Sequence, residues 1–503
     1  MSKNNKNVPA WALTGHKKPT TRREFLGYGM IPFAASTFMP NLMQVLSPQV
    51  AGAQAGCPAG GSSLIPFIQL NLSGGAGLMG NFLPHDLNRN PLASYSIMGF
   101  GAGGTGTPIV REFGNVPFAG NRGDGTIASQ ILLGIQERAM QATRDKTAFV
   151  AMCVRSRDDS SENPFAMNGL AHRAGLVGTV LPHLGTDDSQ TGISQMPVLY
   201  APPAPLVVRG FSAVANALSY TASLNTALNP TQKERLTKLI SDLNGSQARK
   251  LASINSGPAV QQVIDCAGIK NIDLIRAGSG QVDPRANATV AGIWGINATS
   301  ANNSMNLVFS TMVFNTLNGQ AGSCSLNMGG YDYHGNPRDN GTIAPDISSI
   351  GNESTNSRDR RVGRVIGNIL QTAEAMGRPL FLYVTSDGSV SSDDSMTNRQ
   401  SNFISDRGSA GTAFLIMYRP QAMGGRVATT DFQIGHYDRL RNGVIESTQA
   451  ADDTTIVGGS PELATQAAFA NYCKFNNRMD LYNLVVTRGL VETDRLNQVV
   501  KVG

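Results

Sequence analysis

The sequence predicts an α/β protein, and two observations carry this prediction. Short apolar runs with the composition of buried strands alternate with segments in which apolar residues recur at helical spacing. Polar residues that include Asp and His gather directly after several of these runs, where α/β sheets place their ligand-binding loops. The chain of 503 residues is long enough to bury a large core, as one domain or as two joined lobes.

The individual strands and helices follow from this alternation in chain order. Apolar runs predict strands at 65–72, 146–154, 323–328, 380–385 and 412–418. Apolar residues at helical spacing predict helices at 305–317, at 361–376 and from Pro461 to about Cys473. The pattern is clearest at 361–376, where apolar residues share one face and Gly377 follows as a stop.

A polar helical region interrupts the strand pattern between residues 205 and 260. Pro230 begins a helix there, and apolar residues recur at helical spacing from Leu236 to Leu243. Gly245 predicts the end of this helix. We therefore expect residues 205–260 to form a helical cap or an insertion in the main domain.

Residues 1–55 resemble an export leader. Arg22 and Arg23 stand directly before an apolar stretch, and Ala53-Gln54-Ala55 forms a small-x-small cleavage site. An arginine pair followed by Phe-Leu is typical of twin-arginine signals. We therefore expect the twin-arginine translocation machinery as a partner, and a mature protein, residues 56–503, that is periplasmic or secreted. The alternative is a basic N-terminal helix retained on a soluble protein.

The leader also explains the basic character of the chain. It holds six basic side chains and one acidic side chain, so about +1 of the net charge of +6 remains for residues 56–503. Such a body gives no electrostatic reason to expect nucleic acid as a partner. Pro32, Pro40 and Pro48 break the apolar stretch of the leader, so it is too interrupted to be a comfortable membrane span. We expect no stable membrane span in the mature form.

Cysteine usage fits an oxidising compartment. The five cysteines are Cys57, Cys153, Cys266, Cys324 and Cys473. This number allows one or two disulfides, whose pairing cannot be read from spacing. The sequence has no C-x-x-C pair, which argues against a thiolate zinc site. Cys57 follows the predicted cleavage site closely, so a lipid anchor on Cys57 is a second interpretation of the leader.

Candidate metal ligands gather around the predicted strands. Asp332 and His334 follow one strand, Asp387 follows the next, and Asp406 precedes the last. Loops at strand ends can collect carboxylates without burying them unpaired. Carboxylates and one imidazole suit a divalent ion such as Zn²⁺, Mn²⁺, Ca²⁺ or Mg²⁺, which could act as a Lewis acid on a phosphoryl or sulfuryl oxygen. Alternatively, Asp387 and Asp406 are turn residues bonded to nearby backbone, and His334 is a surface or capped histidine.

These residues resemble the motifs of the DUF1501 family, an often twin-arginine-exported group related to sulfatases and alkaline phosphatases. Four stretches carry the likeness, and the first is the twin-arginine leader. Leu72-Ser73-Gly74-Gly75 followed by Pro84 is similar to L-x-G-G-x-D ahead of a proline, and GGYDYHGN from Gly329 is similar to G-G-W-D-T-H-x-N. Thr385-Ser386-Asp387 with Asp406-Arg407-Gly408 is similar to the pair S-E-F-G-R-T and T-D-H-G. The resemblance implies an alkaline-phosphatase-like fold, with a central mixed, mostly parallel sheet, helices on both faces and a helical insertion.

The resemblance is incomplete at positions that would hold metal. Gly77 stands where the first motif has Asp, Asp387 replaces a Glu, and Arg407 replaces a His. A complete two-metal site is therefore not expected. Arg407 is a candidate cation for an anionic ligand, and a salt bridge to Asp406 or Asp387 is equally good chemistry.

No nucleophile is identified, since C-x-P-S-R and G-x-S-x-G patterns are absent from the sequence. Two further His–carboxylate pairs, His85 with Asp86 and His436 with Asp438, are alternative contributors to a metal site.

Two hypotheses about function remain. One is an exported hydrolase of small phosphate or sulfate esters with one metal ion. The other is a non-catalytic periplasmic or surface protein for binding or assembly on the same fold.

Overall fold

The computed structural model describes most of the chain after residue 63. The described residues are 64–73, 76, 78, 81–83, 85–91, 109–120, 129–155, 167–178, 181–186, 205–218, 228–249, 282–331, 358–386, 391–392, 403–404, 410–436, 456–457 and 461–503. The predicted export leader, residues 1–55, lies outside them, and so does Cys57.

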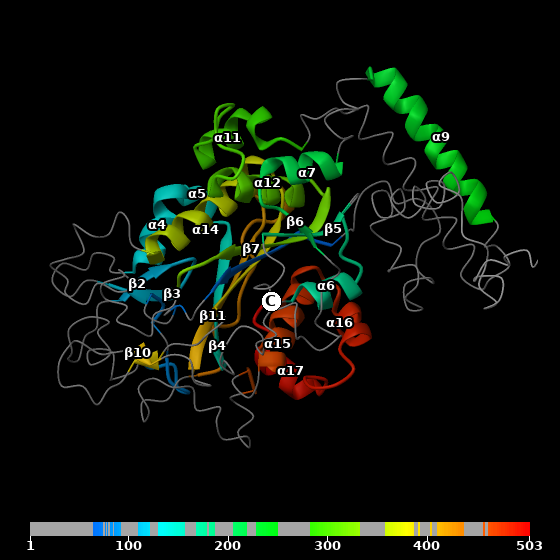
Figure 1. The fold of residues 1–503 in the computed structure, drawn as a ribbon. Helices are drawn as coiled ribbons and strands as arrows, with labels where there is room; N and C mark the ends of the chain where they lie inside the picture. Colours follow the sequence, from blue (N-terminus) through cyan, green and yellow to red (C-terminus); the bar gives the residue numbers. More distant parts are fainter. Residues whose placement is uncertain are drawn as a thin grey trace, which may run out of the picture. The chain divides into compact units, whose positions relative to one another are not determined.

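A mixed sheet of eight strands forms the centre of the larger unit (Figure 1). Its strands, in order across the sheet, are β12 (Gln433–Ile434), β4 (Thr147–Arg155), β11 (Ala410–Tyr418), β8 (Leu380–Ser386), β1 (Phe67–Leu72), β7 (Ala321–Met328), β5 (Leu181–Gly185) and β6 (Leu206–Val207). Strand β11 runs antiparallel to both β4 and β8, and the other neighbours pair in parallel. The predicted α/β class is thereby confirmed, with a mostly parallel sheet.

Strand β1 lies between two parallel neighbours, and all six of its residues are buried. Strand β8 beside it is buried along its whole length. Central parallel strands covered on both faces read as nearly continuous apolar runs, which is why the sequence predicted both.

Helices cover both faces of this sheet (Figure 1). The first face carries α4 (Gln130–Arg138), α5 (Gln141–Arg144), α12 (Met305–Leu317) and α14 (Arg358–Ala375), with α7 (Phe211–Leu218) and α11 (Ala288–Trp294) packed on α12. The second face carries α6 (Asn168–Arg173), α15 (Pro461–Phe475), α16 (Met479–Val485) and α17 (Thr493–Val499). Among the described helices, none is long and apolar enough to cross a membrane.

Helices α4 and α14 pack with their backbones in close contact. A Cβ atom on Gly363 would lie 2.1 Å from the carbonyl oxygen of Ile131, and one on Gly134 would lie 2.2 Å from that of Arg360. Glycine is required at both positions, because any side chain would push the helices apart. The apolar face predicted for 361–376 lies at this contact and on the sheet, since Val362, Val365, Ile366 and Ile369 are buried.

Aromatic rings join α15 to the second face of the sheet. The ring of Tyr472 lies 6.1 Å from that of Phe67 on β1 and 5.4 Å from that of Phe381 on β8, both in edge contacts. The Tyr472 hydroxyl donates to the carbonyl oxygen of Ile65 at 2.8 Å, so its polar end is satisfied. These contacts bury apolar side chains at the amino ends of β1 and β8 on this face of the sheet.

Two small antiparallel sheets accompany the main one. Strand β2 (Ile109–Glu112) pairs with β3 (Val116–Ala119), and β9 (Ser391–Ser392) pairs with β10 (Phe403–Ile404). Phe118 of β3 packs against Phe149 of β4 with 5.4 Å between ring centroids. The first hairpin therefore covers part of the sheet's apolar surface.

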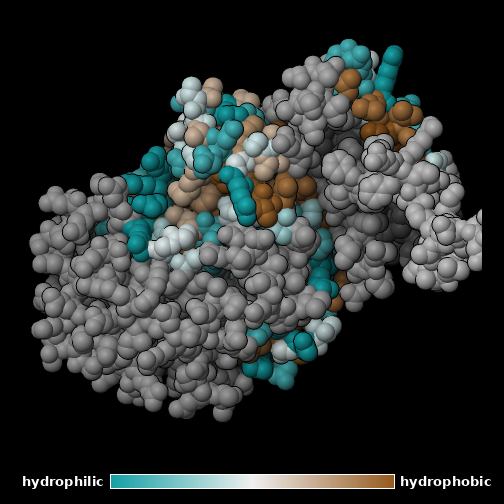
Figure 2. Space-filling view, viewed as in Figure 1, coloured by the Kyte–Doolittle hydropathy of each residue, from teal (hydrophilic) through white to brown (hydrophobic). Residues whose placement is uncertain are grey.

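The chain divides into two compact units, of which the smaller contains residues 226–276. Within it, α9 (Pro230–Arg249) continues through Gly245, so the predicted helix end at this glycine is wrong. An interior glycine costs a helix only about 1 kcal/mol. Leu239 and Leu243 are more than half exposed, and Figure 2 shows apolar surface over α9.

Residues 205–218 were expected in the helical cap, and the structure places them in the larger unit. Strand β6 pairs in parallel with β5, and the amide of Val208 donates to the carbonyl oxygen of Gly185 at 2.7 Å. The helix that follows, α7, packs on α12. A two-residue edge strand carries too little pattern to be recognised in sequence.

Candidate functional site

Three strands end side by side at one edge of the sheet. Leu72, the last residue of β1, pairs with Met328 at the end of β7 and with Ser386 at the end of β8. Strand β11, being antiparallel to β8, begins at this same edge with Ala410. This is the edge at which α/β sheets bind ligands.

The second face of the sheet, which α15 covers, changes from apolar to polar toward this edge. Phe67 and Phe381 lie at the amino ends, where they contact Tyr472. Two residues further along β1 comes Gln69, and two further comes Asn71, on the same face because side chains alternate along a strand. Buried polar side chains are found where they can bond to one another, so this stripe requires a hydrogen-bonded network.

The deep end of the network is centred on His183 of β5, which is fully buried. Its Nδ1 lies 2.9 Å from the hydroxyl oxygen of Ser323, and its Nε2 lies 3.2 Å from that of Ser325. Asn168 of α6 donates to the Ser325 hydroxyl at 2.8 Å. Burial lowers the pKa of His183 to about 3, so the imidazole is neutral at physiological pH.

The outer part of the network links β1, β8 and β7 by side-chain amides. Gln69 donates to the Thr385 hydroxyl at 3.2 Å, and this hydroxyl donates to Asn71 Oδ1 at 3.3 Å. Asn71 and Ser73 both donate to Asn327 Oδ1, at 3.2 and 2.6 Å. These five side chains are uncharged, so they form a rigid, neutral floor under the carboxyl edge.

The residue before Asp332 is anchored to the end of β1. The amide of Tyr331 donates to the carbonyl oxygen of Ser73 at 2.9 Å, and its hydroxyl donates to the carbonyl oxygen of Arg358, the first residue of α14, at 3.1 Å. Gly330 has a φ of 83°, which glycine adopts without steric cost. Burial raises the pKa of the Tyr331 hydroxyl, and Asp359 adds to the shift.

The residue before Asp387 is also anchored to β1. The Ser386 hydroxyl donates to the carbonyl oxygen of Leu72 at 3.1 Å and accepts the amide of Ala76 at 2.6 Å. The residues that precede Asp332 and Asp387 are therefore held by the adjacent residues Ser73 and Leu72 at the end of β1.

The predicted ligands themselves cannot be placed. Asp332, His334, Asp387, Asp406 and Arg407 lie outside the described residues. Within the described part of the chain, no group of three or more His, Cys, Asp or Glu side chains could hold a metal ion. The metal centre at this edge therefore stays a prediction.

Asn81 joins the starts of two helices on the first face near this edge. Its Nδ2 donates to the carboxylate of Asp359 in α14 at 2.6 Å, and its Oδ1 accepts the Ser129 hydroxyl and the Ile131 amide, both at 3.0 Å. Ser129 in turn caps α4 by accepting the amide of Leu132. This buried hub fixes α4 and α14 to the segment that follows β1.

In the alternative pair His85 and Asp86, both side chains bond to nearby backbone groups. His85 Nδ1 bonds the carbonyl oxygen of Leu83 at 2.6 Å, and burial lowers the pKa of the imidazole. Asp86 accepts the amide of Asn90 at 2.8 Å, which closes a turn. His436 is buried, and Asp438 lies outside the described residues.

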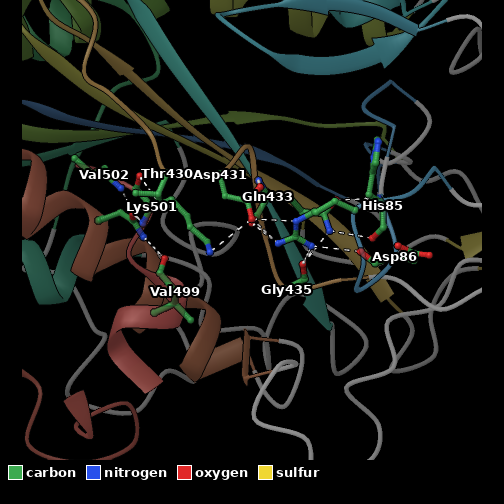
Figure 3. A network of polar contacts seen from close by, with 11 residues as sticks. His85, Asp86, Thr430, Asp431, Gln433, Gly435, Val499, Lys501 and Val502 are labelled. Atoms are coloured by element: carbon green, nitrogen blue, oxygen red, sulfur yellow. Dashed lines mark hydrogen bonds and ion pairs between the residues drawn. The ribbon is translucent and has the colours of Figure 1, made fainter. Parts of the chain in front are cut away.

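The turn after Asp86 is fastened by an ion-pair network (Figure 3). Arg89 bonds the carboxylate of Asp431 at 2.6 Å and donates to the carbonyl oxygens of Gln433 at 3.1 Å and Gly435 at 2.9 Å. Lys501 approaches the same carboxylate at 3.7 Å. The network ties the C-terminal segment to the edge strand β12, and the guanidinium group of Arg89 is bonded to protein groups.

The described cysteines are buried thiols. Cys153, Cys324 and Cys473 are buried, and all three are reduced thiols. Burial raises the pKa of Cys324 to about 12, which keeps the thiol protonated and unreactive. Cys57 and Cys266 lie outside the described residues.

Sequence reasoning missed the neutral network, although a signal was present. Alternate positions of β1 are polar (Gln69, Asn71), and so are those of β7 (Ser323, Ser325, Asn327). Period-two polarity within strands that are otherwise buried indicates side chains that bond across neighbouring strands.

Comparisons of the chain with protein-family models, with curated proteins and with solved structures find no match.

Proposed function

We propose that the chain is an exported, alkaline-phosphatase-like hydrolase of small phosphate or sulfate esters, with one divalent metal ion held by members of the set Asp332, His334, Asp387 and Asp406. The observation that supports the proposal most strongly is the anchoring of Tyr331 and Ser386 to the adjacent residues Ser73 and Leu72 at the end of β1. Neighbouring strands lie about 4.8 Å apart, so the two anchors start their segments within about 10 Å of each other.

The donor chemistry fits one ion. Two or three carboxylates and an imidazole suit Zn²⁺ or Mn²⁺, and carboxylates alone suit Ca²⁺ or Mg²⁺. The described side chains at the edge are amides and hydroxyls already bonded to one another, and they would orient the ligand-bearing segments. A bound ion would supply Lewis-acid polarisation of a phosphoryl or sulfuryl oxygen.

The remaining roles follow from the charge of such a substrate. Arg407 would face the anionic ester, since its planar guanidinium group matches phosphate and sulfate oxygens. The twin-arginine leader would deliver the folded protein to the periplasm or the medium. The mostly parallel sheet with helices on both faces is the architecture that the family resemblance implies, and it supports the proposal at that level.

A binding or assembly protein on the same fold is the second candidate. The neutral, mutually bonded floor favours it, because this floor offers no charged group to a reaction. The replacement of the family's Asp and His by Gly77 and Arg407 favours it as well.

Metal content and ester hydrolysis distinguish the two candidates. The full chain is expressed, purified after export, and loaded separately with Zn²⁺ and Mn²⁺, and bound metal is measured by mass spectrometry. We expect about one ion per chain and hydrolysis of p-nitrophenyl phosphate or p-nitrophenyl sulfate. The double variant D332A/H334A should lose both, whereas D480N, which alters an exposed carboxylate on α16, should keep both. A wild-type chain without metal and without hydrolysis would leave the binding protein as the function.

A further inference from the structure

We infer that Ser386 is a positioning residue, whose side-chain hydroxyl group holds the chain after β1 against the end of β8, from which the segment with Asp387 departs. The effect of Ser386 on metal binding rests on the proposed function. Its role in holding the chain after β1 rests on the hydrogen bonds alone and does not depend on the proposed function.

The two sides of β1 are fastened differently at this edge. On the β7 side, main-chain groups continue the contact beyond the strands: the Ser73 amide donates to the carbonyl oxygen of Met328 at 3.0 Å, and the Tyr331 amide donates to that of Ser73 at 2.9 Å. This side is therefore held by main-chain bonds in addition to the side-chain bonds to Asn327.

On the β8 side the pairing with β1 ends at Leu72 and Ser386. Beyond this pair, among the described residues, the Ser386 hydroxyl takes over the contact, with one bond to the Leu72 carbonyl oxygen and one from the Ala76 amide at 2.6 Å. One hydroxyl thus joins the last residue of β1 to a residue four positions later.

The intervening sequence makes this contact consequential. Gly74 and Gly75 separate Ser73 from Ala76, and glycine loses more conformational freedom on ordering than any other residue. Ser386 is only 9% exposed, so water competes weakly for its two bonds. Removal of the hydroxyl leaves a buried amide and a buried carbonyl group without this partner, and the segment at Ala76 should open more often.

The test compares S386A with S386T, which retains a hydroxyl group on a β-branched residue suited to a strand, and with S323A, which removes a buried hydroxyl on β7 far from Ala76. In hydrogen–deuterium exchange, we expect the Ala76 amide of S386A to exchange at least about tenfold faster than in wild type. S386T and S323A should match wild type. Unchanged exchange in S386A overturns the inference.

Affinity for Zn²⁺ and for Mn²⁺, measured by calorimetry on the same full-length proteins, decides whether the hydroxyl also positions the ligands. We expect S386A to bind about tenfold more weakly and S386T to bind like wild type. If wild type binds an ion and S386A binds it equally well despite faster exchange, the positioning role is refuted. If wild type binds neither ion, the proposed function fails, and the exchange result alone decides whether Ser386 holds the chain at Ala76.

Discussion

Replacement of Gly363 by alanine tests the contact between α4 and α14, which carries one of the anchors of the site. Ordinary contacts of a Cβ atom begin at 3.4 Å, whereas a Cβ on Gly363 would lie 2.1 Å from the carbonyl oxygen of Ile131 and 2.9 Å from Gly134 Cα. Both are backbone atoms, so no side-chain rotation relieves the overlap, and the helices must separate by about 1 Å.

The expected loss of stability follows from two opposing effects. Overpacking of a tight interface costs about 1–3 kcal/mol and occasionally more. Alanine is favoured over glycine inside a helix by about 1 kcal/mol, which offsets part of that cost. Because the overlap is with main chain, we expect the upper end of the range and a net destabilisation of about 2 kcal/mol.

Urea unfolding measured by the fluorescence of Trp294 reports on this region, because the indole donates to the Thr372 hydroxyl of α14 at 2.9 Å. The matched control is G292A on α11, where an added Cβ would meet nothing within 4 Å and should raise stability by up to about 1 kcal/mol. A G363A midpoint equal to or above that of wild type would refute the reasoning.

Three further predictions concern buried or paired groups. His183 has a folded pKa of about 3, below the unfolded value of about 6.5. The neutral imidazole therefore contributes its full stability above pH 6.5, and this contribution falls as the pH falls. Between pH 7 and pH 5, wild type should lose about 2 kcal/mol more unfolding free energy than H183Q in urea unfolding, and equal losses would contradict burial of the imidazole. D431N removes the carboxylate that Arg89 contacts, and we expect about 1 kcal/mol lower stability at low salt and a smaller difference at 1 M NaCl; a salt-independent difference would speak against an ionic contribution. W294F removes the bond to Thr372, and thermal unfolding should show a loss of about 1–2 kcal/mol, which T372V should share without adding to it in the double variant.

The long central strands were predictable from sequence because burial on both faces gives them many apolar residues, even where alternate positions of β1 and β7 are polar. Strands β1, β4, β7, β8 and β11 all lie where apolar runs predicted them. Strand β5 was missed because Pro182 and His183 interrupt its pattern, and β12 because it has two residues.

Tertiary contacts explain the helices that sequence reasoning missed. In α4, Gly134 breaks the helical pattern, yet this glycine is present because α14 approaches its backbone. Helix α6 begins with Asn168, whose side chain serves the buried network and not an apolar face. Such positions are set by a partner distant in sequence, and local propensity cannot reveal that partner.

The sequence predicted that the candidate site lies where strands of the sheet end, without its detailed structure. Polar residues after β7 and β8 indicated the edge, and strand order brings those strands next to β1. The hydrogen-bonded floor was not predicted, because Asn71 and Thr385 belong to strands whose other residues form the core. The ligand set stays a prediction, since Asp332 and Asp387 lie outside the described residues.

The position of β1 has a consequence for biosynthesis. Its partners on either side are encoded far downstream, as the contacts from Asn71 to Asn327 and to Thr385 span 256 and 314 positions of the chain. A nascent polypeptide emerging from the ribosome cannot complete the sheet until β12 has been translated, and β1 lacks its two native neighbours until β7 and then β8 have emerged. Long-range pairing of this kind slows folding and exposes strand edges to aggregation. The strand order therefore predicts that the sheet forms late and slowly during synthesis.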